Sequence, residues 1–120
     1  MLNFIKPLKI YLFKDSLTVN FNIRVSDNSV HAYKFNASDF ENLLVHWQDQ
    51  NGVEFKINNN YWHVQWKKRG PRPQSEVVDY VKISVSVNTG QTFHYRVDFL
   101  DMYQMQQEYF YQKNNKMYWD

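Results

Sequence analysis

The sequence has no cysteine, only three glycines and three prolines, and no long apolar run. Without cysteine, a disulfide framework and a thiolate metal site are excluded, so a reducing cytoplasm is the expected location. No apolar stretch approaches the roughly 20 residues of a membrane-spanning helix, and the one near the N-terminus is too short for a signal peptide. So few glycines nearly exclude a phosphate-cradling loop. We therefore expect no membrane partner, no metal and no cofactor.

Catalytic motifs are missing as well. The four histidines form neither H-x-H nor H-E-x-x-H, and the chain has no G-x-S-x-G and no Walker loop. His63 and His94 fall on polar faces of expected strands, where Glu54 or Asp79 could join them in a cross-strand cluster. Ordinary surface histidines are the alternative reading. The sequence therefore predicts a protein that is not an enzyme.

Aromatic residues are abundant, with nine Tyr, nine Phe and four Trp among 120 residues. Because Leu and Ala are scarce, rings and β-branched side chains must build the core, and strands accommodate these better than helices. This length suits one domain covering residues 1–120.

The clearest pattern is an alternation of apolar and polar residues over 76–99, which predicts two half-buried strands. A three-residue loop at 88–90 keeps both apolar faces on one side and pairs Val85 with Phe93 and Ile83 with Tyr95. It also puts Gly90 where such a turn requires a left-handed residue. We expect a long antiparallel hairpin.

Strands are also predicted at 8–12, 17–25 and 30–35, and as a second hairpin over 53–66. The tip of that hairpin is a two-residue loop, either Asn58-Asn59 or Asn59-Asn60. The segment before Pro7 is read as a lead-in to the first strand.

Two helices are expected. Ser38 and Glu41 have the spacing of a capping box, an apolar stripe follows from Phe40 to Trp47, and Gly52 is a stop signal. The second helix runs from Met102 to about residue 113, capped by Asp98 or Asp101.

The predicted order is βββαβββ(β)α, with short connections that favour antiparallel neighbours. The fold class is α+β. We expect a strongly bent antiparallel sheet, or a small open β-barrel, of about six to seven strands with two helices.

A basic cluster, Lys67, Lys68, Arg69 and Arg72, lies in a proline-containing loop, and no acidic residue lies among these four charges. Such a cluster would contact phosphates without sequence preference. A solvated loop between hairpins is the alternative.

The predicted pairing sets Ser84 opposite His94 and Lys82 opposite Arg96. Like charges directly opposite each other are destabilising, so Tyr80, Asp98, another acid or a bound anion would relieve them, unless the side chains splay into water. A nucleic-acid backbone is such an anion, and Tyr61, His63 and Tyr80 offer rings for stacking unpaired bases.

A protein partner is the other hypothesis. The stretch from Met102 to Trp119, with Met117 and Tyr118, is rich in residue types found at interface hot spots. The same residues could instead complete the core.

The chain, cysteine-free, rich in Tyr, Asn and Lys and opening Phe-Ile-Lys-Pro-Leu-Lys at residues 4–9, resembles the PrgU-type regulators of Gram-positive conjugative plasmids in size, composition and element order. This resemblance implies a PUA-like β-barrel, RNA-binding character and a role in restraining toxic surface-protein production. Small phage-encoded inhibitors of host defence are similar in the same respects. The predicted function is a non-enzymatic RNA-binding or other nucleic-acid-binding regulator of a mobile element, and the alternative is a small protein-interaction inhibitor.

Overall fold

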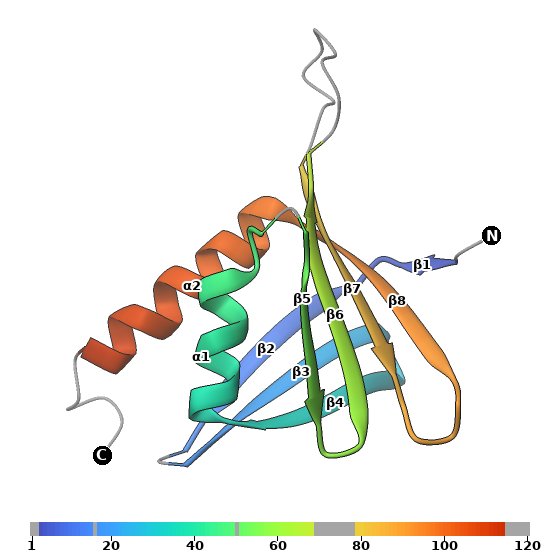
Figure 1. Cartoon of the computed structure of the whole chain (residues 1–120), viewed down its shortest axis with the longest axis horizontal. Helices are drawn as coiled ribbons and strands as arrows, with labels where there is room; N and C mark the ends of the chain where they lie inside the picture. Colours follow the sequence, from blue (N-terminus) through green and yellow to red (C-terminus); the bar gives the residue numbers. More distant parts are fainter. Residues whose placement is uncertain (1–2, 16, 50, 69–78, 115–120) are drawn as a thin grey trace, which may run out of the picture.

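The computed structural model describes residues 3–15, 17–49, 51–68 and 79–114. These residues form two helices and eight strands in two sheets, which confirms the predicted α+β class and the two helices. The large sheet has the order β1 (Phe4–Ile5), β8 (Thr92–Asp98), β7 (Tyr80–Ser86), β6 (Asn60–Lys67), β5 (Val53–Ile57). The small sheet consists of β2 (Lys9–Lys14), β3 (Thr18–Ser26) and β4 (Ser29–Asn36). Helices α1 (Ala37–His46) and α2 (Phe99–Asn114) lie on one side of the large sheet (Figure 1).

The expected single sheet of about six to seven strands is corrected to eight strands divided between two sheets. The described strands do not close into a barrel. The additional strand is β1, which pairs in parallel with β8, setting Phe4 beside His94. The sequence reading treated this segment as a lead-in, because a strand of two residues has no periodicity to detect.

The hairpin of β7 and β8 has the predicted register, with Val85 opposite Phe93, Ile83 opposite Tyr95 and Lys82 opposite Arg96. Gly90 adopts a left-handed φ of 90° and its amide donates to the Val87 carbonyl at 2.9 Å. Only a glycine adopts this conformation without steric cost. The loop prediction is therefore confirmed.

The hairpin of β5 and β6 turns at Asn58 and Asn59, which have φ values of 51° and 68°. Positive φ at both central residues is the primed turn that two-residue hairpins favour. Of the two predicted loop positions, Asn58-Asn59 is the correct one.

Helix α1 buries the predicted stripe, including Phe40, Leu43 and Leu44. Its N-cap is Asn36 rather than Ser38, because the Asn36 side chain accepts a hydrogen bond from the Asp39 amide at 2.7 Å. Gly52 does not end the helix. Trp47 is the C-cap, and Gly52 lies in the turn that leads into β5.

Helix α2 begins at Phe99, immediately after β8, and not at Met102 as predicted. The Phe99 amide donates to the Asp79 carbonyl at 3.0 Å, which ties the start of the helix to the residue before β7. Met102, Met105 and Tyr109 are buried in the core.

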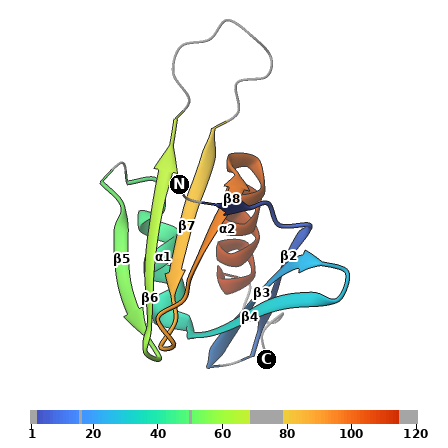
Figure 2. The same ribbon diagram turned by 90° about the vertical axis from the view of Figure 1, so that its right-hand side faces the viewer.

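The core lies where the inner faces of both sheets meet the helices. Trp62 of the large sheet has its ring centroid 4.9 Å from Phe35 and 6.2 Å from Phe21, both on the small sheet. Seen in Figure 2, the large sheet faces the viewer and both helices lie behind it, so they leave its outer face uncovered. Neither helix in the described residues has the length and apolar composition to cross a membrane.

Candidate nucleic-acid interface

Strand alternation places the polar residues of β6, β7 and β8 on the side of the large sheet away from the core. We call this surface the large-sheet outer face. Cross-strand pairing brings together on it Tyr61, His63, Gln65, Lys67, Tyr80, Lys82, Ser84, Ser86, Thr92, His94, Arg96 and Asp98. The face therefore gathers six residues predicted to bind nucleic acid, namely Tyr61, Lys67, Tyr80, Lys82, His94 and Arg96.

The basic loop is placed only at its start. Lys67 ends β6 opposite Tyr80, at the margin of the large-sheet outer face, and Lys68 follows it with an exposed side chain. Arg69 and Arg72 lie outside the described residues.

Each cation of the like-charge pair Lys82–Arg96 lies against an aromatic ring. The Arg96 guanidinium lies 4.2 Å from the centroid of Tyr80, and the Lys82 ammonium lies 5.6 Å from the centroid of Phe4. Each contact is a cation–π interaction, which orients a cation without neutralising it. Within the described part of the chain, neither Lys82 nor Arg96 forms an ion pair with a carboxylate. Both positive charges stay available to an anion.

The histidines of this face have separate partners. His94 Nδ1 lies 3.0 Å from Ser84 Oγ, and His63 Nδ1 lies 3.1 Å from Glu54 Oε1. The pKa of the exposed Glu54 carboxyl is lowered, first by a hydrogen bond from the Tyr61 hydroxyl and then by that from His63. His63 and His94 therefore do not form the cross-strand cluster with a shared carboxylate that the sequence suggested. Among residues 3–15, 17–49, 51–68 and 79–114, no three His, Asp or Glu side chains are grouped to hold a metal ion.

Two rings on this side of the large sheet are accessible for stacking. Tyr61 is 43% exposed and Phe4 is 41% exposed, and Phe4 lies with its ring centroid 6.2 Å from that of His94. Phe4 was missed by the sequence reading, because only the pairing of β1 with β8 brings it to this surface.

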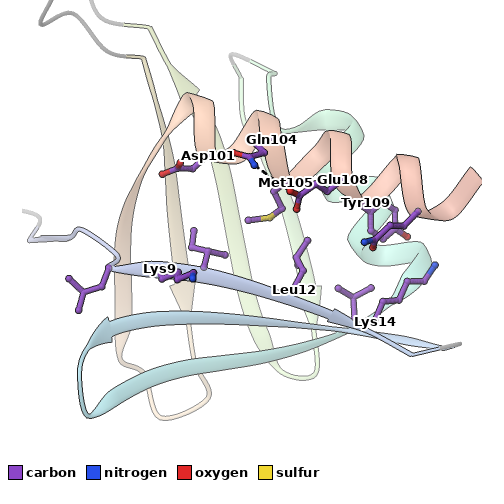
Figure 3. Close-up of a pocket in the computed structure, with 12 residues that line it drawn as sticks. Lys9, Leu12, Lys14, Asp101, Gln104, Met105, Glu108 and Tyr109 are labelled. Carbon is purple, nitrogen blue, oxygen red and sulfur yellow. Dashed lines mark hydrogen bonds between the residues drawn. The ribbon is translucent and has the colours of Figure 1, made fainter. Parts of the chain in front are cut away.

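A groove of about 440 Å³ separates β2 from α2 (Figure 3). Lys9 and Lys14 line it from β2, and Asp101 and Glu108 line it from α2. Opposite charges on the two walls do not favour a polyanion. The described residues that line it include no His, Ser or Thr, and the Tyr109 hydroxyl donates to the Ala37 carbonyl at 3.2 Å.

The apolar residues of α2 that could contact a protein partner fall into a buried group and an exposed group. Met102, Met105 and Tyr109 complete the core, whereas Leu100, Tyr103 and Tyr111 are exposed on α2. Met117, Tyr118 and Trp119 lie outside the described residues.

Comparison of the chain with models of known protein families, with curated proteins and with solved structures finds no significant match.

Proposed function

We propose that the protein is a non-enzymatic nucleic-acid-binding module that holds single-stranded RNA on its large-sheet outer face. The observation that carries the proposal is the Lys82–Arg96 pair, in which two cations face each other across the strands beside aromatic rings and, among the described residues, neither cation is ion-paired with a carboxylate. Since like charges opposite each other destabilise a sheet, an anion bound between them is stabilising.

The rest of this face suits the chemistry of an unpaired strand. Lys67, Lys82 and Arg96 supply charges for phosphates, and the exposed rings of Tyr61 and Phe4 supply flat surfaces for bases. Stacking on aromatic side chains beside a cationic backbone contact is how single strands are held without strong sequence preference. The proposed PUA-like architecture and the regulatory role in a mobile element rest on the resemblance to PrgU-type regulators.

Removing the charges of this pair provides the test. Lys82→Gln combined with Arg96→Gln is expected to weaken binding of fluorescein-labelled U12 RNA, measured by anisotropy between 50 and 300 mM salt. Because a single strand releases about 0.7 counterion per phosphate contact, losing two contacts lowers the slope of log K against log salt by about 1.4. Lys113→Gln is the matched control, since Lys113 pairs with Glu41 between the helices.

Equal affinity and equal salt slope for the wild type and the double variant would contradict the proposal. So would the absence of U12 binding by the wild type.

A second candidate function is protein contact through α2, favoured by the exposed apolar side chains of Leu100 and Tyr103 one helical turn apart. The same titration separates the two candidates, because a chain that acts only through α2 does not bind U12.

A further inference from the structure

Among the described residues, the small sheet also has a face that points away from the core. Alternation along its strands turns Phe21, Ile23 and Phe35 into the core. Their neighbours face outward, and we call this surface the small-sheet outer face. It is formed by Lys9, Tyr11, Phe13, Asn20, Asn22, Arg24, Val30, Ala32 and Lys34.

This face repeats the arrangement found around Lys82 and Arg96. Lys9 lies directly opposite Arg24 across the strands. Both cations contact one ring, with the Lys9 ammonium 5.0 Å and the Arg24 guanidinium 5.7 Å from the centroid of Tyr11. In the described ranges, neither cation has a carboxylate within ion-pair distance. Each sheet therefore displays a Lys–Arg pair beside aromatic rings on its outer surface.

A flat ring and a third cation extend the small-sheet outer face. Phe13 is 57% exposed and its ring stacks on Tyr11, with centroids 6.3 Å apart and planes 6° from parallel. Lys34 is exposed and lies opposite Asn20.

None of the residues that form this face is acidic. At the adjoining turn, the Asp15 carboxylate accepts hydrogen bonds from the Leu17 and Thr18 amides at 2.9 and 2.6 Å. The surface thus fits a ligand with both negative charge and flat rings, which is the chemistry of an unpaired nucleic-acid strand.

We propose that the small-sheet outer face is a second binding surface for single-stranded nucleic acid, so that one molecule holds two segments at the same time. This inference rests on the proposed function of the large-sheet outer face. Because both sheets turn their inner faces to one core, their outer faces lie on different sides of the molecule. A short oligonucleotide occupies one face only, whereas a long strand engages both. An anionic membrane would engage the same cations and the exposed Phe13 side chain, so phosphatidylserine vesicles are one arm of the test.

The test compares stoichiometry and strand length. Native mass spectrometry with U8 RNA is expected to show two oligonucleotides per wild-type chain and one for the small-face variant Phe13→Ala with Lys34→Gln. One is also expected for the large-face variant Lys82→Gln with Arg96→Gln, and none when the four substitutions are combined. Because joining two sites by one ligand raises affinity by about 100-fold or more, U30 should bind the wild type about 100-fold more tightly than U8. Either paired variant should lose that gain.

Conservative changes guard against a folding defect. Phe13→Tyr with Lys34→Arg keeps a ring and a charge, so it should bind two U8 molecules, as Lys113→Gln should.

Three results would overturn the inference in distinguishable ways. If the wild-type chain binds one U8 molecule and only the large-face variant loses it, the small-sheet outer face is not a binding surface, and the proposed function of the large-sheet outer face is unaffected. No U8 on any chain removes both. If the small-face variant still binds two U8 molecules but no longer binds phosphatidylserine vesicles, this face is assigned to membranes and the inference is removed.

Discussion

At the scale of single residues, the start of α1 shows how a strand decides which side chain caps a helix. Asn36 is the last residue of β4 and has extended φ and ψ values of −74° and 158°. It is paired with Thr18 of β3. The chain becomes helical at Ala37, so the Asn36 side chain is the one within reach of the Asp39 amide. Ser38 is already inside the first turn and cannot take that position.

Replacing the cap tests this assignment. Asn36→Ala should lower the free energy of unfolding by about 1 kcal/mol, because it removes the acceptor of a free helix amide. Ser38→Ala, at an exposed position, should change the free energy by less than about 0.5 kcal/mol. Urea denaturation of both variants measures the difference, and a larger loss for Ser38→Ala would contradict the assignment.

The residues of the candidate site could be predicted only in part from the sequence. Parity of side chains along β6, β7 and β8 was sufficient to predict that Lys82, Arg96 and His94 share one face, because direct neighbours across antiparallel strands lie on one side. It was not sufficient to find Phe4 or the pair Tyr11 and Phe13. Phe4 depends on a pairing between opposite ends of the chain. Tyr11 and Phe13 carry no signal of a binding surface in the sequence, because only the strand register shows that Lys9 lies opposite Arg24 beside them.

At the scale of elements, the hairpin of β5 and β6 is specified by its turn. Asn58 and Asn59 both have positive φ, and Asn tolerates this region better than most residues because its side chain bonds the local backbone. Asn58 has a second role, since its side-chain amide donates to the Lys34 carbonyl at 3.3 Å and so connects the two sheets.

The two turn residues should therefore respond differently to glycine. Asn59→Gly should raise the free energy of unfolding by about 0.5 kcal/mol, because Asn-Gly is the preferred pair for this turn. Asn58→Gly should give no such gain, because it removes the hydrogen bond to Lys34. Thermal unfolding of the two variants side by side checks this, and equal stabilisation by both would show that the Asn58 contact is unimportant.

The boundaries of elements were harder to predict than the elements. Helix α2 begins without a loop after β8, because the Phe99 amide is held by the Asp79 carbonyl beside β7. No local capping signal at Asp98 or Asp101 encodes that contact.

At the scale of the whole molecule, a hydrogen-bonded chain of side chains joins the two sheets. His31 of β4 contacts the hydroxyl of Tyr95 of β8 through its Nδ1, and the Tyr33 and Tyr95 hydroxyls lie 3.0 Å apart. Burial raises the pKa of Tyr95, whose hydrogen bond with Tyr33 adds to the shift. Burial lowers the pKa of His31 below its ordinary value of 6.5.

Stability should therefore fall on mild acidification. Well above its ordinary pKa of 6.5 the His31 ring is neutral in both states. Below it the unfolded chain binds a proton that the folded chain resists until its own lower pKa is reached. Urea unfolding between pH 7.5 and 5 should show this loss, and His31→Gln should reduce it, whereas exposed His46→Gln should not. An unchanged pH dependence in His31→Gln would contradict the assignment.

The sequence by itself determined the periodic features of this protein: which side chains of β3, β6, β7 and β8 face the core, the register of the central hairpin, and the buried stripe of α1. These depend on neighbouring residues and on the parity of short turns, which are local properties of the chain. Only the tertiary structure decided that the strands divide into two sheets, that β1 joins β8, and that a Lys–Arg pair beside aromatic rings appears on each outer face. Those features depend on contacts between distant segments, whose free energy is gained only when the whole core assembles.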